Sequence, residues 1–437
     1  MKWGKCHWGP GLGLWRAILK KGLSAFDPGP VIDYGLECRL LGRRNFLEIQ
    51  EHQRGGASRV MVLRTIGALL TGVILSAGCG QALAETAHMP RVAFINPGFG
   101  SKGFWKDVSE TMHAAAKQFG FEIVEFDSDR QWPLMAQNAN RVFAMDPPPD
   151  YIIASNEHQQ GGRIIIEANT RHIPIFMLLN DLTDEQKARL GHAGGKKLPY
   201  WIATLTPDNK KAGYDIARSL VVADEKLHPD ETDRDICLLS LTGDWNTPAS
   251  LDRIAGLDLA LADFPVLDEK RRLVANWSYD EAYKRTAGWL PEGCLDAVWA
   301  ANDDIARGAI AAIEDTGKVA GKDVVVGGLN WSAQGLKLVK EGKMTMTHGG
   351  HFLAGAWIMV MLNDFHNGVD LQGKGPNYSF PMQAITRDNV DLFQEKFGKR
   401  DWNIVDFTSF SLSGREQDDA TYQFDLKHLF AAIKPDR

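Results

Sequence analysis

Short apolar runs alternate along this chain with segments whose apolar residues recur at helical spacing, and this alternation constrains its fold more than any other feature. In the first half, the expected strands cover residues 91–96, 121–126, 151–154 and 173–179, and the expected helices cover 106–119, 133–144 and 161–169. A strand followed by a helix and then by another strand favours parallel pairing, with helices on both faces of the sheet. This half therefore predicts a doubly wound parallel sheet.

The same alternation begins again in the second half of the chain. There the expected helices cover residues 208–222, 248–262, 279–290 and 304–316, and the expected strands cover 236–241, 273–275, 296–300 and 324–328. A last helix over 349–365 and an extended segment near 378–385 follow. Each half is about the size of one domain. We therefore predict an α/β fold with two doubly wound lobes.

The residues that follow the expected strands point to a binding site. In doubly wound sheets, ligands bind beyond the carboxyl ends of the strands. Here those positions are rich in aromatic rings, amides and charge: Phe104-Trp105, Asn156-Glu157, Asn180-Asp181, Trp245, Asn276-Trp277, Asn302-Asp303 and Asn330-Trp331. Aromatic rings can cover the apolar faces of a sugar, and amides and carboxylates can hold its hydroxyl groups. The inventory therefore favours a polyhydroxylated ligand.

A segment well inside the chain has the features of an export signal. Two arginines supply positive charge, residues 66–77 form an apolar core, and residues 82–84 give a small-x-small cleavage pattern. The core is shorter than the roughly 20 residues that span a bilayer. We therefore predict a signal peptide over residues 61–84 and a periplasmic protein, and we expect residues 1–60 to be a non-native or disordered upstream extension.

The five cysteines lack the close spacing of a zinc or redox motif. Cys79 follows Ser-Ala-Gly, which resembles the cleavage box of bacterial lipoproteins, so a lipid anchor at Cys79 is the alternative to simple removal of the signal peptide. Cys237 and Cys294 lie in the expected mature part. They could pair in an oxidising compartment. However, each flanks or lies in an expected strand, and we favour two separate small buried residues.

Charge and motifs disfavour several classes of function. A formal net charge of -6 argues against a nucleic-acid partner, which would require a basic face. No P-loop or Ser-His-Asp order stands out, and nothing in the sequence sets the separation of Glu157 and Asp244 that a two-carboxylate hydrolase would need. His348 and His351 lack a third metal ligand nearby. We therefore expect no enzymatic activity, no metal and no cofactor.

Seven motifs, in this order, resemble the type I periplasmic binding proteins, the group of ribose- and galactose-binding proteins. They are INPGFGSKGFW, IPIFMLLND, TPDNKKAGY, TGDWNTPASLDRIAGLDLAL, ANWSYDEAY, WAANDDIARGAIAAIEDTG and VVVGGLNWSAQGLKLVKEGKMTMTHGGH. The resemblance covers about residues 90–398 and looks closest to a little-described sugar-binding branch. It implies two lobes joined by three crossovers, near residues 202–207, 345–348 and 379–385. The lobes would comprise residues 85–204 plus 348–380 and residues 205–347 plus 381–437.

The resemblance also implies ligand-binding residues. Phe104 and Trp105 match the aromatic pair that stacks on the sugar ring, and Arg253 matches the arginine that holds its oxygens. The other matches are polar and follow later strands: Asn180 or Asp181, Asn302, Asn330 and His348. Asn330 stands where ribose binders carry Asp, and His348 stands near a usual Gln. With Trp277 and Trp331, which complete the expected site, these departures leave the identity of the sugar open.

The implied function is capture of a sugar or sugar-like solute in the periplasm and its delivery to the membrane permease of an ABC transporter. We expect a monomer with no nucleic-acid partner. A sensory receptor of the same fold, coupled to a membrane kinase or chemoreceptor, stays open as the alternative because its pocket would look identical. A repressor would need a helix-turn-helix where the export signal lies. No catalytic motif that would indicate an enzyme stands out in the sequence.

Overall fold

A computed structural model describes residues 89–100, 103–231, 234–373, 375–415 and 421–435. The expected signal peptide, the possible lipid anchor at Cys79 and the upstream extension lie outside these residues. The described residues belong to one compact unit, Ala82–Arg437. Within them, no helix is both long and apolar enough to cross a membrane.

The first sheet has six strands, all parallel, in the order β11-β5-β4-β3-β1-β2. In chain order these are β1 Arg91–Asn96, β2 Glu122–Asp127, β3 Tyr151–Ala154, β4 Ile175–Leu178, β5 Trp201–Pro207 and β11 Asn377–Phe380. All residues of β3 and β4 are buried. Helices cover both faces of a parallel sheet, which explains why its inner strands are continuous apolar runs.

The second sheet repeats this architecture with the order β12-β10-β9-β8-β6-β7. Its strands are β6 Ile236–Thr242, β7 Leu267–Val274, β8 Ala297–Ala300, β9 Val325–Leu329, β10 Met346–Gly349 and β12 Gln383–Thr386. Only β12 runs antiparallel to its neighbour β10. The expected fold of two doubly wound parallel lobes is therefore confirmed.

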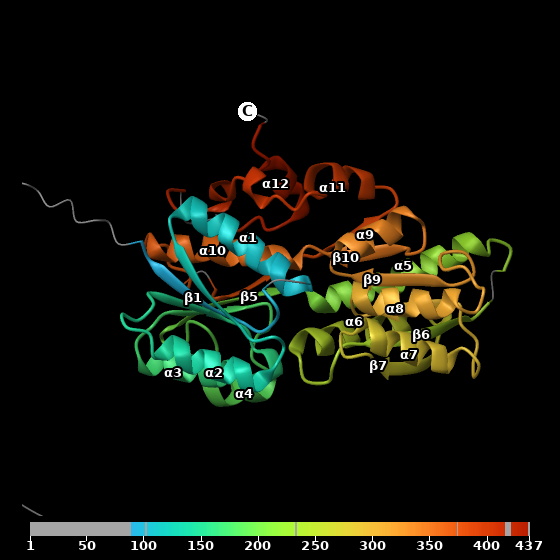
Figure 1. Cartoon of the computed structure of the whole chain (residues 1–437), viewed down its shortest axis with the longest axis horizontal. Helices are drawn as coiled ribbons and strands as arrows, with labels where there is room; N and C mark the ends of the chain where they lie inside the picture. The colour runs from blue at the N-terminus through green and yellow to red at the C-terminus, as the bar shows by residue number, and fades with distance from the viewer. Residues whose placement is uncertain (1–88, 101–102, 232–233, 374, 416–420, 436–437) are drawn as a thin grey trace, which may run out of the picture. The chain divides into compact units, whose positions relative to one another are not determined.

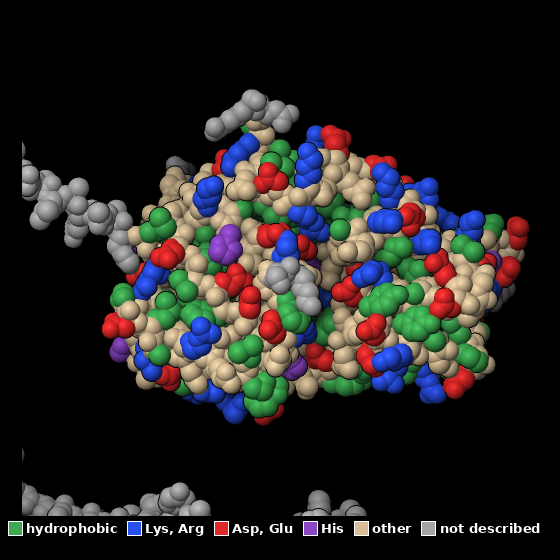
Figure 2. Space-filling model, in the orientation of Figure 1, with side chains coloured by type: hydrophobic (Ala, Val, Ile, Leu, Met, Phe, Trp, Pro, Cys, Tyr) green, Lys and Arg blue, Asp and Glu red, His purple; other side chains and the backbone are tan. Residues whose placement is uncertain are grey.

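Helices flank each sheet (Figure 1). Around the first are α1 Gly103–Phe119, α2 Trp132–Phe143, α3 Gly161–Thr170, α4 Asp184–Leu190 and α10 Ala354–His366. Around the second are α5 Asn209–Leu227, α6 Pro248–Asp263, α7 Tyr279–Trp289, α8 Asp303–Glu314 and α9 Ala333–Lys340, and α11 Val390–Phe397 and α12 Leu426–Ala431 come last in the chain. Figure 2 shows basic and acidic side chains interspersed over one face of the molecule.

The chain passes between the two sheets three times: after β5, after β10 and between β11 and β12. The exact lobe boundaries stay a prediction, and the last residues contact both sides. Helix α11 contacts α9 and β12, whereas the 3₁₀ helices Trp402–Ile404 and Phe407–Phe410 contact α1. Between these two 3₁₀ helices, the carbonyl of Val405 accepts a hydrogen bond of 2.8 Å from the side chain of Gln118 in α1.

Several local predictions are corrected. The expected helix over 349–365 begins only at Ala354, because β10 runs to Gly349 and Gly350 adopts a φ of 97°, which interrupts helical backbone. The expected strand over 273–275 begins earlier, at Leu267. The extended segment near 378–385 is two strands, β11 and β12, one in each sheet.

The cysteines also differ from the favoured expectation, because Cys237 and Cys294 form a disulfide with their Cα atoms 5.8 Å apart. Cys237 lies in β6, which pairs with β8, and Cys294 comes three residues before β8 begins at Ala297. The pairing of these two strands therefore brings together cysteines that are 57 residues apart in sequence.

Candidate functional site

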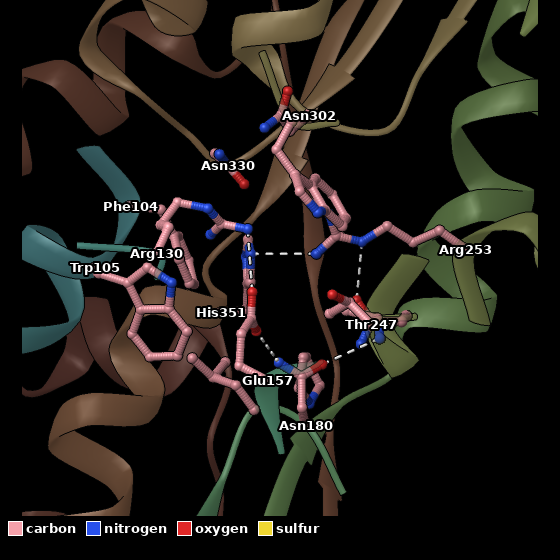
Figure 3. Close-up of a pocket in the computed structure, with 15 residues that line it drawn as sticks. Phe104, Trp105, Arg130, Glu157, Asn180, Thr247, Arg253, Asn302, Asn330 and His351 are labelled. Carbon is pink, nitrogen blue, oxygen red and sulfur yellow. Dashed lines mark hydrogen bonds and ion pairs between the residues drawn. The ribbon is translucent and has the colours of Figure 1, made fainter. Parts of the chain in front are cut away.

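A cavity of about 80 Å³ lies beyond the carboxyl ends of strands from both sheets (Figure 3). Seven of the expected ligand-binding residues line it: Phe104, Trp105, Asn180, Arg253, Trp277, Asn302 and Asn330. Eight further residues complete the lining: Arg130, Glu157, Leu179, Pro207, Asn209, Thr247, Ala249 and His351. On this measure one water needs about 10–15 Å³, so the cavity suits one small solute.

Aromatic rings form one wall of the cavity. Phe104 stacks on His351 with ring centroids 4.4 Å apart, and it meets Trp105 edge to face at 5.5 Å. Both phenyl and indole stand at the start of α1, after the turn that follows β1. That turn requires Gly98, because a Cβ at this position would lie 2.1 Å from the ring of Trp105. The glycine thus allows the indole to pack against the backbone beside the cavity.

Arg253 of α6 is buried, with 3% of its surface exposed, and is held by acceptors from other elements. Its Nε donates to Asn209 at 2.9 Å, and one terminal nitrogen donates to the carbonyl of Ala301 at 2.8 Å. The other terminal nitrogen lies 3.3 Å from Nε2 of His351, and the guanidinium lies 5.4 Å from the ring centroid of Trp277. The guanidinium plane is therefore fixed before any ligand arrives.

Burial sets the charge states at the centre of the cavity. It lowers the pKa of Arg253 to about 9, partly opposed by the nearby carboxylates of Asp252 and Asp303, so the guanidinium is a cation at neutral pH. Burial also lowers the pKa of His351 well below its usual range, and the positive charge of Arg253 adds to this shift. His351 is consequently neutral at pH 7.

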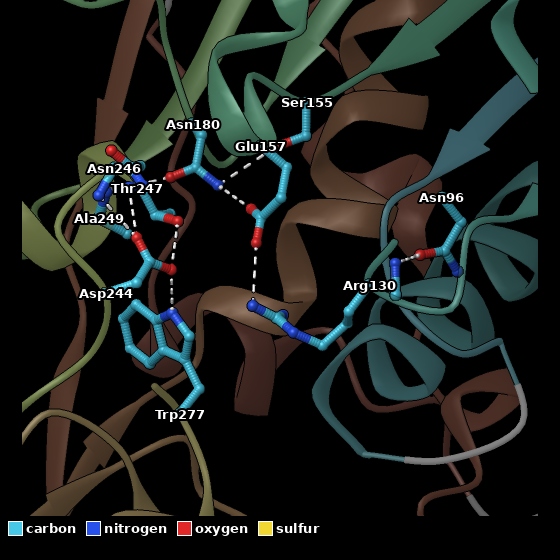
Figure 4. Close-up of polar contacts among 11 residues, drawn as sticks. Asn96, Arg130, Ser155, Glu157, Asn180, Asp244, Asn246, Thr247, Ala249 and Trp277 are labelled. Carbon is cyan, nitrogen blue, oxygen red and sulfur yellow. Dashed lines mark hydrogen bonds and ion pairs between the residues drawn. The ribbon is translucent and has the colours of Figure 1, made fainter. Parts of the chain in front are cut away.

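A chain of polar contacts links the two lobes at the cavity (Figure 4). Arg130 pairs with one oxygen of Glu157 at 3.1 Å, and the amide of Asn180 donates to the other oxygen at 3.1 Å and to Ser155 at 3.3 Å. The side-chain oxygen of Asn180 accepts a hydrogen bond of 3.1 Å from the backbone N–H of Ala249 in α6. Asn180 follows a strand of the first sheet, so this bond joins the two lobes.

Asp244 positions the indole of Trp277 on the opposite side of the cavity (Figure 4). One carboxylate oxygen accepts from the backbone of Asn246 and Thr247 at 2.8 and 2.7 Å. The other accepts from the hydroxyl of Thr247 at 2.8 Å and from the indole N–H of Trp277 at 2.7 Å. Burial alone would raise the pKa of Asp244, but these hydrogen bonds outweigh it and the pKa is lowered.

Four residues that line the cavity have positive φ angles, a backbone conformation that residues other than glycine rarely adopt. They are Arg130 at 57°, Leu179 at 67°, Trp277 at 60° and Asn330 at 148°. Each comes shortly after the end of a strand, namely β2, β4, β7 and β9. Such backbone outliers persist only where the surrounding structure enforces them, and they concentrate at functional sites. Their clustering here supports this cavity as the candidate site.

Asn302 has two roles, one in its helix and one at the cavity. Its side-chain oxygen accepts a hydrogen bond of 2.8 Å from the backbone of Ile305 and so caps α8, while the residue also lines the cavity. The next residue, Asp303, is fully buried and accepts hydrogen bonds from Ser332 and Thr347. Burial raises the pKa of Asp303 to about 6, although these hydrogen bonds act to lower it.

Two of the expected residues after strands lie outside the cavity lining. Asp181 forms an ion pair with Lys187 at 2.7 Å and accepts a hydrogen bond from the next backbone N–H, so its carboxylate serves the local turn. Trp331 is 1% exposed and packs against Phe393 of α11, with its indole N–H bonded to the carbonyl of Gln383 at 3.0 Å. Of the alternatives Asn180 and Asp181, it is Asn180 that lines the cavity, and Trp331 does not line it.

His348 also lies outside the lining, and His351 takes the place expected for it. His348 is in β10, and its Nε2 lies 3.2 Å from the carboxylate of Asp215 in α5. Gly350 turns the chain after β10, and this turn brings His351 against Phe104. Across the described ranges, no group of three or more His, Cys, Asp or Glu side chains is placed to hold a metal ion.

Sequence reasoning missed Arg130, Glu157 and His351 as lining residues. Glu157 was among the residues that follow strands, and His351 belonged to the His-Gly-Gly-His run, so both carried a signal. Arg130 comes three residues after β2, within a polar turn that has no distinguishing motif. Its position depends on the unusual φ angle described above.

Comparison with known proteins agrees with this architecture. Residues 92–365 match the family described as the periplasmic binding protein domain. The xylitol-binding protein of Mycolicibacterium smegmatis is 30% identical over 161 residues, which span 36% of this chain and less than half, 44%, of that protein.

Solved structures are similar over more of the chain. A periplasmic sugar-binding protein from Pseudomonas fluorescens has 29% sequence identity and a TM-score of 0.69, covering 78% of this chain and 99% of its own. The periplasmic binding component of the arabinose ABC transporter from Shewanella sp. ANA-3 has a TM-score of 0.61 over 71% of this chain and 96% of its own. Its sequence identity is 20%, so it supports the fold alone.

Proposed function

The chain belongs to the periplasmic binding protein domain family, and from that premise we propose that it captures a sugar or polyol between its lobes and delivers it to an ABC-type membrane transporter. The observation that carries the proposal is the cavity, in which aromatic rings and polar groups from both sheets converge. The names of the xylitol-binding and sugar-binding relatives support a polyhydroxylated ligand.

Closure of the two lobes is the central step of the proposed mechanism. Binding proteins of two lobes close around their ligands by hinge motion. The hydrogen bond from Ala249 to Asn180 crosses between the lobes and can form only when they are close. A ligand that contacts both lobes favours this closed state because it adds contacts that the open state lacks. The transporter would then recognise the closed form.

Each lobe supplies a different part of the proposed recognition. Phe104 and Trp105, from the first lobe, offer apolar ring surface for stacking on the carbon skeleton of the ligand. Arg253, Asn302 and Asn330, from the second, offer hydrogen-bonding groups for its oxygens. We propose that binding therefore requires both lobes, and that catalysis plays no part.

Titration calorimetry of the purified full chain against sugars, polyols and their derivatives tests the binding proposal. A ligand should also raise the melting temperature, since a ligand at 100 times its Kd stabilises a protein by about 2.7 kcal/mol. Phe104→Ala should weaken binding at least tenfold, whereas Trp331→Phe, outside the cavity lining, should leave it within twofold. The absence of any ligand among these compounds would refute the proposal.

Uptake measurements test the delivery step separately. Cells that lack this protein should lose uptake of the radiolabelled ligand, and expression of the unchanged chain should restore it. If uptake persists and only a transcriptional or chemotactic response to the ligand disappears, the protein is a sensor and not a transport component.

A further inference from the structure

Several polar groups of the cavity present hydrogen-bond donors that no protein group in the described residues accepts. Asn209 and Asn302 both use their side-chain oxygens on protein partners, the guanidinium of Arg253 and the backbone N–H of Ile305. Their amide NH₂ groups have no protein partner in the described part of the chain, and both residues line the cavity. Each therefore has two donors available to a ligand, while its carbonyl oxygen already accepts one hydrogen bond.

Arg253 adds donors that its protein partners do not use. A guanidinium has five N–H groups and no acceptor. Three of the five are directed at Asn209, Ala301 and His351, so two are left for a ligand. All three of these partners are neutral acceptors, and none of them is a carboxylate.

The tautomer of His351 follows from this contact and adds one more donor. Because the guanidinium can only donate, Nε2 of His351 must be the acceptor, and the proton of the neutral ring must be on Nδ1. His351 is only 4% exposed, and its buried Nδ1–H has no protein partner among the described residues. An unpaired buried donor is unfavourable, and a ligand oxygen that reached this N–H would satisfy it.

The charges that line the cavity do not cancel. Arg130 and Glu157 offset each other through their ion pair, which leaves the buried cation of Arg253 without a carboxylate partner in the lining. The carboxylates of Asp252 and Asp303 act on Arg253 through space, but neither forms an ion pair with it among the described residues, and Asp303 accepts hydrogen bonds from Ser332 and Thr347. Asn330, where the resemblance to ribose binders would place an Asp, contributes no charge.

We propose that the ligand is a small sugar acid, a polyhydroxylated carboxylate whose anionic oxygens face Arg253 and the Nδ1–H of His351. This inference rests on the proposed function, because it names the ligand class of the same cavity. A carboxylate has only acceptors and carries the charge that the lining lacks. A neutral polyol would stack on the aromatic rings equally well, but it would leave the guanidinium of Arg253 without a negatively charged partner. Each hydroxyl group that accepted from one of these donors would also need an acceptor for its own proton.

Matched pairs of ligands that differ in charge provide the test. Calorimetry of the full chain at pH 7.5 compares xylonate with xylitol, galactonate with galactitol, and galacturonate with galactose. We expect at least one acid to bind at least tenfold more tightly than its neutral partner. Equal or tighter binding of every neutral partner overturns the sugar-acid inference but leaves the proposed function intact. Failure of all compounds to bind refutes both.

A charge-altering variant gives an independent readout. Asn330→Asp places a carboxylate in the cavity with almost no change in size, and it should weaken binding of the acid at least tenfold more than it weakens binding of the neutral partner. Asn140→Asp adds the same charge at an exposed position of α2 and should change neither affinity by more than twofold. If Asn330→Asp weakens the acid and its neutral partner equally, the charge argument is wrong. If that variant does not fold, the ligand pairs with the unchanged chain still decide.

Discussion

Replacing Asp244 by asparagine should release the indole of Trp277, because an amide cannot accept from every donor that the carboxylate holds. The oxygen of the new side chain can keep the bonds from the backbone of Asn246 and Thr247. Its NH₂ then faces the Thr247 hydroxyl and the indole N–H of Trp277, which lie 2.8 and 2.7 Å from the present carboxylate oxygen. The hydroxyl can rotate and accept, but the indole can only donate.

The expected loss is therefore one hydrogen bond to a charged group, together with one donor left unpaired. Hydrogen bonds to charged groups contribute about 1.5–3 kcal/mol, so Asp244→Asn should lower the free energy of unfolding by about 2–3 kcal/mol. Urea unfolding of the full chain, followed by tryptophan fluorescence, measures this. The exposed turn residue Asp230 provides a control, since Asp230→Asn should stay within about 0.5 kcal/mol.

A double-mutant cycle and a pH series sharpen the same prediction. If Asp244 acts through Trp277, the double variant Asp244→Asn, Trp277→Phe should lose at least about 1 kcal/mol less free energy of unfolding than the sum of the two single losses. The lowered pKa of Asp244 means that its contribution is complete above the unfolded pKa of about 3.9 and disappears as the pH falls below it. The stability gap between wild type and variant should thus close below about pH 4. Additive losses, or a gap that persists in acid, would refute the reasoning.

Two further predictions concern the frame that holds the cavity. Replacing both Cys237 and Cys294 by alanine should lower the free energy of unfolding by about 4 kcal/mol, because the disulfide closes a separation of 57 residues. Melting with and without reductant checks this, and a reductant that does not move the wild-type transition would contradict it. Gly98→Ala should lower both melting temperature and ligand affinity, since the added Cβ would lie 2.1 Å from the ring of Trp105. Gly288→Ala, at a helical position with open space around it, should be neutral or stabilising by up to about 1 kcal/mol, and equal behaviour of the two alanine variants would argue against this packing.

The agreement between predicted and observed strands does not follow their place in the sheet. Edge strand β2 was predicted within one residue, whereas the inner strands β5 and β10 were not predicted as strands. Strands β1 and β3 have the predicted bounds because helices bury both their faces, which makes them unbroken apolar runs. Strand β7 lies at the edge of its sheet and reads LDEKRRLV, so only its apolar end was found. Helix α4 was missed although its start carries a recognisable signal, the capping box between Thr183 and Gln186.

The site shows where a local pattern stops being informative. Trp277 and Trp331 both stand in Asn-Trp-Ser runs after strands, and their φ angles are nearly equal at 60° and 55°. Yet Trp277 lines the cavity beside Arg253, whereas Trp331 is covered by Phe393. The difference comes from a helix about 60 residues further along the chain, and no pattern around either tryptophan contains it.

Electron density for a bound ligand tests the central claim most directly. Crystals of the full chain grown with the tightest-binding compound from the calorimetric series should show that compound in the cavity. Its carbon skeleton should lie against Phe104 and Trp105, with its oxygens within hydrogen-bonding distance of Arg253. A ligand bound elsewhere on the molecule, with this cavity filled only by water, would contradict the account.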